Sequence, residues 1–251
     1  MDEKEQLEPD MLAPPTDQAL YQRMVGKLIL LTPTRPDIAY AVRIVSRFMS
    51  KPQEPHARAV KHLYRYLRGT TDFALLYRRG EDLTLHGFTD ADWAGDTHDR
   101  KSTTGYIFMI GSSPITWNSK KQPTIALSST ESEYMAITEG TKEALWLRSL
   151  LEELRMSDPK VPTIIYGDNQ GSLNLAHNPI YHARTKHIEV KHHFIREKVS
   201  AGQVKLEYIP TSEQLADIMT KALGRIAFER LRCQLGLVRI EPHQPFELTP
   251  C

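Results

Sequence analysis

The stretch Gly87–Trp93 constrains the fold of this chain more than any other part of the sequence. An apolar run from Leu83 to Phe88 leads directly into two carboxylates, Asp90 and Asp92, which are two residues apart. Side chains at positions i and i+2 of a strand point to the same face of its sheet, so the pattern is typical of a strand with acids at its end. We therefore predict a sheet with acidic chemistry where this strand ends.

Three later acids also lie where a regular element is expected to begin or end. Glu133 lies near the start of a long helix, Asp168 follows an apolar strand, and Asp217 lies near the start of a late helix. Together with Asp90 they supply four hard oxygen donors, which repel one another unless cations lie between them, and Mg²⁺ suits such ligands. Each acid alone also has a structural explanation, because first-turn acids complement a helix dipole and Asp is common in turns.

Four acids brought together at the ends of neighbouring elements are typical of a two-metal site. Two ions roughly 4 Å apart clamp the attacking water and the leaving oxygen of a phosphodiester. The sequence contains no Gly-x-Ser-x-Gly and no P-loop to favour another chemistry.

The first part of the chain is expected to be helical. Apolar residues recur at helical spacing over 18–31, 38–49 and 56–68, and prolines or Gly69 interrupt the pattern between and after these segments. These three helices are predicted to form a small subdomain, because they lack strands for a sheet of their own.

From residue 71 onward the pattern changes to strands and then alternates between strands and helices. Strands are predicted over 73–77, 83–89, 103–110 and 115–117, the last three as an antiparallel meander. Ser128-x-x-Glu131 is a capping box that starts a long helix. Two further strands, 163–166 and 204–209, each follow a helix and can therefore lie parallel in the same sheet. The predicted fold class is α/β, with a mixed five-stranded sheet of three antiparallel and then two parallel strands, flanked by helices.

Total charge does not point to a nucleic-acid partner, because the formal net charge is only +1, so any such contact must be local. Two basic segments could follow a phosphate backbone. The first has no acid among its cations, although a solvated helix face is an equally good explanation, and it comprises Arg58, Lys61, Arg65 and Arg68. The second lies within 182–201 and includes Arg184, Lys186, His187 and Lys191.

Cellular location is also constrained by the sequence. No apolar run approaches the length of a membrane span, the N-terminus is acidic rather than signal-like, and the two cysteines do not have the spacing of a zinc site. We expect an intracellular protein, cytoplasmic or nuclear, that is not secreted and has no membrane partner.

The acidic segments resemble those of ribonuclease H. Phe88-Thr-Asp-Ala-Asp92 is similar to its first acidic strand, and Glu133-Tyr-Met-Ala136 is similar to its acidic helix. Tyr166-Gly-Asp-Asn-Gln170 resembles its third acidic strand end, and Leu215-Ala-Asp217 resembles its last acid.

Over about residues 20–236 the chain is also similar to the C-terminal region of Ty1/copia retrotransposon polyproteins. The matching runs are Asp90–Asp96, Lys101–Tyr106, Trp117–Gln122, Ser128–Tyr134, Arg184–Ile188 and Gln214–Ile218. The helices before residue 70 resemble the thumb or connection end of reverse transcriptase. No Tyr-x-Asp-Asp polymerase motif is present, and Ile209–Glu213 replaces the histidine loop of many ribonucleases H.

From their composition, residues 1–17 are expected to be a disordered acidic tail and residues 237–251 a second disordered tail. The resemblance implies that 18–70 is a helical remnant of the thumb or connection and that 71–236 is a ribonuclease H-like domain. It implies a metal-dependent endonuclease that cleaves the RNA strand of RNA–DNA hybrids and leaves 3′-hydroxyl and 5′-phosphate ends. The implied ligands of two Mg²⁺ or Mn²⁺ ions are Asp90, Glu133, Asp168 and Asp217, and the polymerase part of a reverse transcriptase is an expected partner.

Two other interpretations remain. One is an inactive retrotransposon-derived remnant that binds nucleic acid without turnover. The other is an integrase-type transposase of the same fold, which the acid in Glu133-Tyr-Met-Ala136 disfavours.

Overall fold

The structure, a computed structural model, describes residues 7–79, 83–156, 158–177 and 186–240, with side chains described from residue 193 onward in the last range. Its contacts divide the chain into two units. Among the described residues, the helical unit comprises 7–77 together with 221–240, and the sheet unit comprises those between 78 and 220.

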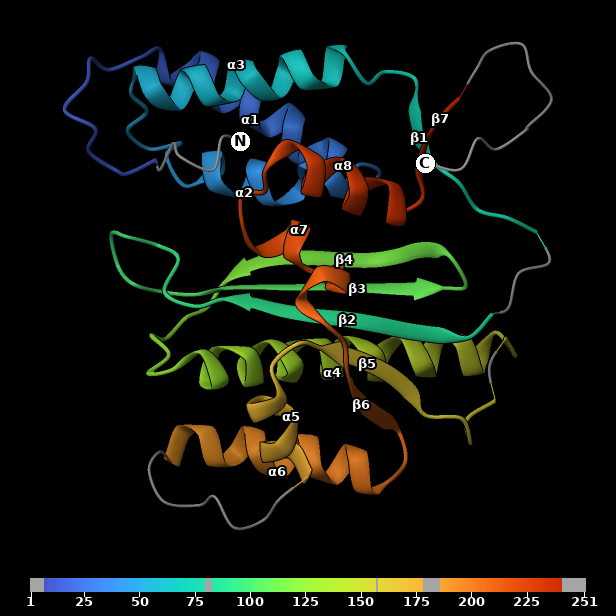
Figure 1. Ribbon diagram of the computed structural model, residues 1–251. Helices are drawn as coiled ribbons and strands as arrows, with labels where there is room; N and C mark the ends of the chain where they lie inside the picture. Colours follow the sequence, from blue (N-terminus) through green and yellow to red (C-terminus); the bar gives the residue numbers. More distant parts are fainter. Residues whose placement is uncertain (1–6, 80–82, 157, 178–185, 241–251) are drawn as a thin grey trace. The chain divides into compact units, whose positions relative to one another are not determined.

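The sheet unit is built on five strands. They are β2 (Leu85–Asp92), β3 (Thr103–Ile110), β4 (Ser113–Lys121), β5 (Thr163–Gly167) and β6 (Val204–Tyr208). Their order across the sheet is β4-β3-β2-β5-β6. β2, β3 and β4 are antiparallel, whereas β5 pairs in parallel with both β2 and β6 (Figure 1). This arrangement confirms the predicted ribonuclease H-like sheet of three antiparallel and then two parallel strands.

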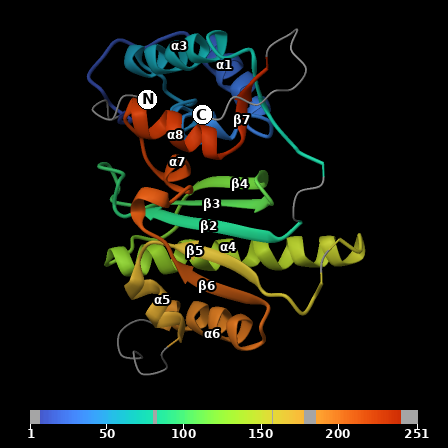
Figure 2. The ribbon, with the colours of Figure 1, turned by 45° about the vertical axis from the view of Figure 1, so that its right-hand side comes forward.

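Helix α4 (Ser129–Glu153) lies along one face of this sheet (Figures 1 and 2). Its predicted N-cap is confirmed, since Ser128 Oγ accepts a hydrogen bond from the Glu131 amide at 3.1 Å. The reciprocal bond of the capping box reaches one residue further back, because Glu131 Oε2 accepts from the Leu127 amide at 2.9 Å. Ile137 and Leu147 of α4 are buried, whereas Leu154 follows the last residue of the helix and is 57% exposed.

The described part of the sheet unit also contains three shorter α-helices and a 3₁₀ turn. They are α5 (Gln170–His177), α6 (Lys186–Ser200), the 3₁₀ turn η2 (Thr211–Glu213) and α7 (Asp217–Thr220). α5 and α6 pack beside α4, and their apolar side chains join its core through Leu173 and Ile195. α7 packs on β2, β3 and β4.

The helical unit contains α1 (Gln18–Leu31), the 3₁₀ turn η1 (Pro36–Ile38), α2 (Ala39–Ser46), α3 (Glu54–Arg68) and α8 (Arg225–Gln234). The three predicted helices before residue 70 are therefore confirmed. A buried polar network holds them together: Arg35 forms a 2.7 Å ion pair with Asp37, and Tyr66 donates to the same carboxylate at 2.6 Å. Arg232 of α8 donates to the Tyr66 hydroxyl at 3.2 Å, which ties the C-terminal helix to α3.

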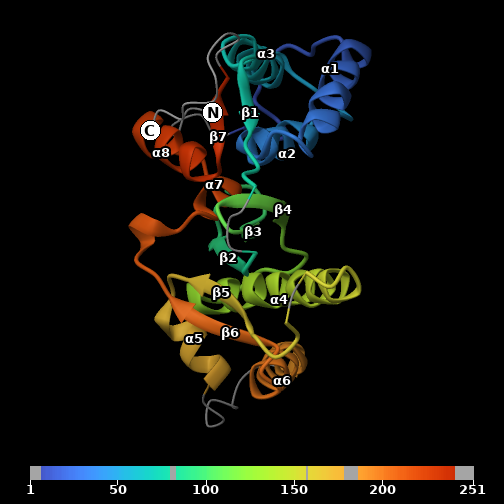
Figure 3. The same ribbon diagram turned by 90° about the vertical axis from the view of Figure 1, so that its right-hand side faces the viewer.

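A short two-stranded sheet explains why the division of the chain differs from the predicted boundaries. β1 (Phe73–Leu75) pairs antiparallel with β7 (Leu237–Arg239), as Figure 3 shows, and not with the five-stranded sheet. Arg232 lies 4.4 Å from the centroid of the Phe73 ring. Residues 73–77 and the segment after 220, expected in the ribonuclease H-like domain and its tail, therefore belong to the helical unit.

The acidic segment expected as a disordered tail is also ordered where the structure describes it. Leu7 is 8% exposed. The Met11 amide donates to Gln53 Oε1 at 2.7 Å. The rest of both predicted tails, residues 1–6 and 241–251, lies outside the described residues, as do residues 80–82 between the predicted strands 73–77 and 83–89.

Candidate active site

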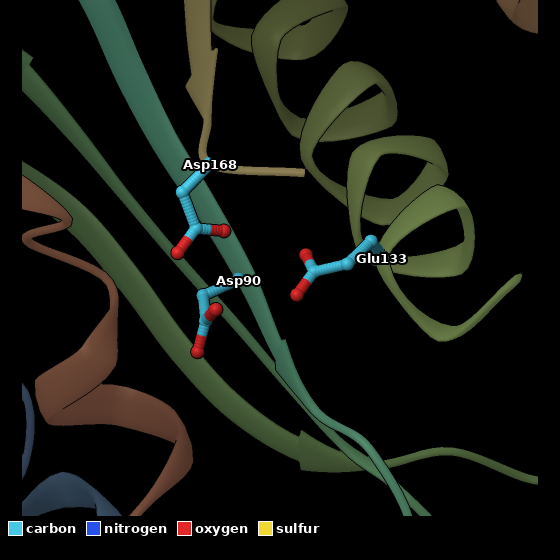
Figure 4. Close-up of side chains that lie close together, drawn as sticks. All are labelled: Asp90, Glu133 and Asp168. Carbon is cyan, nitrogen blue, oxygen red and sulfur yellow. The ribbon is translucent and has the colours of Figure 1, made fainter. Parts of the chain in front are cut away.

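The ends of β2 and β5 and the beginning of α4 bring three acidic side chains together. Asp90 lies near the end of β2, Glu133 in the first turns of α4, and Asp168 directly after β5. Each offers a carboxylate oxygen, and these oxygens all lie within 4.8 Å of one another. Figure 4 shows the three side chains gathered between the strand ends and the helix. Sequence analysis predicted all three.

Local structure explains why these carboxylates meet. β2 and β5 are parallel neighbours, with Phe88 opposite Tyr166, so the positions after this pair emerge at the same edge of the sheet. The N-cap at Ser128 fixes where α4 begins and therefore the height of Glu133 above the sheet. The Gln122 side chain supports the same turn, because its amide donates to the Ser132 carbonyl at 3.0 Å and to Thr104 Oγ1 at 2.9 Å.

Most of the negative charge of the site is shielded from water. Asp90 and Glu133 are 3% and 7% exposed, and Asp168 is half-buried. Carboxylates at such separations repel one another strongly where water is scarce. Oxygen-rich, negatively charged sites of this kind suit Mg²⁺ or Mn²⁺, so the donor set fits the predicted divalent cations. Burial raises the pKa of the neighbouring Tyr134 phenol, which stays neutral and adds no charge of its own.

Two site carboxylates accept hydrogen bonds from threonine hydroxyls that sequence analysis did not single out. Thr220 Oγ1 donates to Asp90 Oδ2, and Thr211 Oγ1 donates to Asp168 Oδ2 at 2.7 Å. The sequence signal that could have found them is their proximity to Asp217 and to the segment that replaces the histidine loop.

The structure does not bring Asp217 into the group of three carboxylates, among the residues that it describes. Asp217 was predicted near the start of a helix, and it is the first residue of α7. Its side chain is buried, and α7 spans only four residues. Thr220 of α7 contacts the group through Asp90. Asp217 as a fourth ligand therefore remains a prediction.

The other acids in and after β2 have local roles. Asp92 lies over Gly95, where an added Cβ would be 1.7 Å from Asp92 Oδ2. Asp96 and Asp99 both pair with Lys121 at the end of β4, the second of these pairs at 2.8 Å. Of the two acids in β2, only Asp90 belongs to the carboxylate group.

The first predicted basic segment forms an exposed surface of α3. We call this the α3 basic face, and it comprises Arg58, Lys61, Arg65 and Arg68. Of the second segment, Arg184 lies outside the described residues. Lys186, His187 and Lys191 lie in α6, in a stretch whose side chains the structure does not describe. His193 is exposed.

The topology and the three convergent carboxylates define a ribonuclease H-like domain. No family model matches the chain. The Pol polyprotein from transposon RE1 of Arabidopsis thaliana is 44% identical over 227 residues, which is 90% of this chain and 15% of that protein. The Pol polyprotein from transposon TNT 1-94 of Nicotiana tabacum is 46% identical over 218 residues, which is 86% of this chain and 16% of that protein.

The chain therefore belongs to the family of Ty1/copia-type retrotransposon Pol polyproteins, and it spans about 15% of the length of those relatives. A solved structure of a foamy viral protease-reverse transcriptase in complex with an RNA/DNA hybrid has the same fold over most of the chain. Its TM-score is 0.50 at 12% identity, and the match covers 96% of this chain and 29% of that one. Among the described residues, no helix is both long enough and apolar enough to cross a membrane.

Proposed function

We propose that this chain is a ribonuclease H that hydrolyses the RNA strand of RNA–DNA hybrids during retrotransposon reverse transcription. The observation that carries the proposal is the group formed by Asp90, Glu133 and Asp168, whose oxygens lie within 4.8 Å of one another at the edge of a ribonuclease H-like sheet. The polyprotein relatives support it, and so does the hybrid named for the foamy viral enzyme.

Asp90, Glu133 and Asp168 would hold the divalent ions, with Asp217 as the predicted fourth ligand. Two bound Mg²⁺ or Mn²⁺ would neutralise charge on the scissile phosphate and help to generate the attacking hydroxide. Through these ions the carboxylates would fix where the phosphate lies, and the burial of Asp90 and Glu133 keeps their charges largely unscreened. Selection of RNA over DNA would depend on contacts with the 2′-hydroxyl, which only the RNA strand carries.

Affinity for the hybrid would come from phosphate contacts along its length, for which the α3 basic face is the described candidate. We further propose that the helical unit corresponds to the thumb or connection region and that the polymerase part of a reverse transcriptase is its partner.

Cleavage of a labelled RNA–DNA hybrid by the full chain tests the proposal. Hybrid, duplex DNA and duplex RNA are each incubated with Mg²⁺, with Mn²⁺ and with a chelator. The proposal predicts that, with either metal, only the RNA strand of the hybrid is cut, leaving 5′-phosphate ends. No substrate should be cut when the chelator is present. Binding of hybrid without any cut under either metal would instead support the inactive remnant, and cleavage of duplex DNA would refute the assigned substrate.

A further inference from the structure

The segment from Thr211 to Thr220, which follows β6, contacts two of the three site carboxylates through hydroxyl groups. Thr220 donates to Asp90 Oδ2, and Thr211 donates to Asp168 Oδ2 at 2.7 Å. We propose that Thr220 and Thr211 are positioning residues, which fix the Asp90 and Asp168 carboxylates in the orientation that binds a divalent cation. The proposal deepens the ribonuclease function proposed above and rests on it for the identity of the cation.

A buried glutamine holds this segment against β2. Gln214 is fully buried, and its amide nitrogen donates to the Thr89 carbonyl at 2.9 Å. Its Oε1 accepts from the Ala216 amide at 3.2 Å, so the side chain joins the backbone of the segment to the backbone of β2. Thr89 immediately precedes Asp90. The bond from Gln214 therefore holds the segment against β2 next to Asp90.

A glycine in the neighbouring strand allows α7 to approach this closely. Gly105 of β3 lies opposite Asp90 in the strand register. A Cβ at position 105 would lie 2.6 Å from Thr220 Cγ2 and 2.7 Å from Met219 Cβ. Thr220 and Met219 are fully buried, so neither can move aside easily. The absence of a side chain at Gly105 thus sets the distance at which the Thr220 hydroxyl reaches Asp90.

These contacts account for parts of two sequence runs that the acidic residues alone leave unexplained. Gly105 lies in the run Lys101–Tyr106, and Gln214 lies in the run Gln214–Ile218. Gln214 joins the backbone just before α7 to Thr89, the residue before Asp90, and Gly105 leaves room for Thr220 of α7, so both residues position the segment that contacts Asp90.

The physical reason for such a device is the freedom of an aspartate carboxylate. The last torsion of Asp is broad, so an isolated carboxylate samples many orientations. A hydroxyl that donates to one of its oxygens removes part of that freedom before a cation binds. Metal-ligating carboxylates are generally hydrogen-bonded in this way, and loss of such a partner lowers metal affinity by roughly 10–100-fold. Thr220, buried from water, should have the larger effect, and Thr211, which is exposed, the smaller.

Binding of Mn²⁺ by the full chain, without nucleic acid, tests the proposal through the EPR signal of free Mn²⁺. Thr220→Val and Thr211→Val remove the hydroxyls with little change of shape, whereas Thr220→Ser and Thr211→Ser keep them. Matched controls are Thr138→Val and Thr34→Val. Thr138 is buried and Thr34 exposed, and each donates its hydroxyl to a backbone carbonyl, at 2.8 and 3.1 Å respectively.

The expected result is a loss of Mn²⁺ affinity of roughly 10–100-fold in Thr220→Val and a smaller loss in Thr211→Val. The serine variants should recover most of the affinity, and the two control variants should bind as the wild type does. If both valine variants bind Mn²⁺ with wild-type affinity, or if the serine variants are as weak as the valine variants, the positioning role is refuted. Should Thr220→Val fail to fold, the exposed Thr211 pair decides by the same criteria.

Cleavage of hybrid, measured separately, distinguishes this proposal from the proposed function. Weakened Mn²⁺ binding in the valine variants of a protein that cuts no hybrid would support the positioning role and refute the ribonuclease. A wild-type chain that binds no Mn²⁺ at millimolar concentration would overturn the positioning proposal itself.

Discussion

Replacement of Gly105 by alanine should destabilise the sheet unit, because the new methyl group has no space. It would lie 2.6 Å from Thr220 Cγ2, 2.7 Å from Met219 Cβ and 3.1 Å from the Ala216 carbonyl oxygen. Carbon atoms pack at about 3.5–4.0 Å, so α7 would have to move away from the sheet by roughly 1 Å. All three neighbours are fully buried, and α7 also packs on β2 and β4, so relaxation would be incomplete.

The magnitude follows from two opposing effects. Overpacking of a filled interior costs about 1–3 kcal/mol. Loss of glycine freedom in the unfolded chain returns about 0.4–1 kcal/mol. A net loss of about 1–2 kcal/mol should lower the midpoint of thermal unfolding by roughly 2–8 °C, as each kcal/mol corresponds to about 2–4 °C for a chain of this size.

Calorimetry of Gly105→Ala beside Gly167→Ala provides the test. Gly167 is also a strand glycine of the sheet, but a Cβ there would meet only Leu173 Cδ2, at an ordinary 3.6 Å. The control should be neutral or slightly stabilised. If Gly105→Ala unfolds at the wild-type temperature, the close approach of α7 to β3 does not constrain the fold, and the argument from Gly105 to Thr220 is wrong.

Three further predictions concern the ligands, the substrate contacts and one buried histidine. At limiting Mg²⁺, Asp90→Asn should reduce hybrid cleavage far more than Asp92→Asn, because only Asp90 belongs to the carboxylate group; equal losses would contradict that assignment. Neutralising the α3 basic face should weaken hybrid binding and reduce the salt slope by roughly 1 for each lost phosphate contact, with little change in cleavage at saturating hybrid; an unchanged slope would show that this face does not touch the substrate. Burial lowers the pKa of His56 from its ordinary 6.5, and its Nδ1 accepts from the Gln53 amide, so its contribution to stability is complete above pH 6.5 and is lost as the pH falls through the lowered folded-state pKa. The free energy of unfolding of the helical unit, measured in urea, should therefore fall less steeply with falling pH in His56→Gln than in the wild type. The same pH dependence in both proteins would refute this.

The strands of the main sheet and their antiparallel or parallel direction could be predicted because each part of the chain identifies its own element. The alternating and apolar runs mark the strands, and the Ser128 cap marks α4. A helix between two strands permits a parallel pair, and a tight turn imposes an antiparallel one. These local signals were sufficient for a sheet of three antiparallel and two parallel strands, whereas the order β4-β3-β2-β5-β6 across the sheet was first seen in the structure.

The pairing of β1 was not predicted, because it depends on a contact distant in sequence. The prediction expected 73–77 to precede the meander in the same domain, whereas Phe73 lies opposite Arg239. β7 is only three residues long and gives almost no periodic signal. The boundary between the two units could not be placed without this pair.

The candidate site also has residues that local patterns predict and residues that depend on contacts distant in sequence. Asp90, Glu133 and Asp168 lie at strand ends and a helix start that local patterns define, so their convergence could be expected. Whether Asp217 joins the group depends on how α7, a four-residue helix, lies on the sheet, and no local pattern of the sequence specifies this. The hydroxyl contacts of Thr211 and Thr220 depend on side-chain orientations, which no sequence pattern specifies.

Single-turnover cleavage of an RNA–DNA hybrid by Asp168→Asn tests the central claim most directly. Asparagine keeps the shape of the side chain and can still accept the Thr211 hydrogen bond, but it lacks the charge that would bind the cation. Asp158→Asn is the matched control, because Asp158 is an exposed turn acid whose Oδ1 accepts from the Lys160 amide at 2.9 Å.

Loss of a ligand's charge should raise the barrier by about 3 kcal/mol or more, which is a fall in rate of at least roughly 100-fold. The account predicts this loss in Asp168→Asn, with hybrid binding retained and with Asp158→Asn as fast as the wild type. A rate within a few-fold of the wild type in Asp168→Asn would show that the three carboxylates are not the catalytic centre.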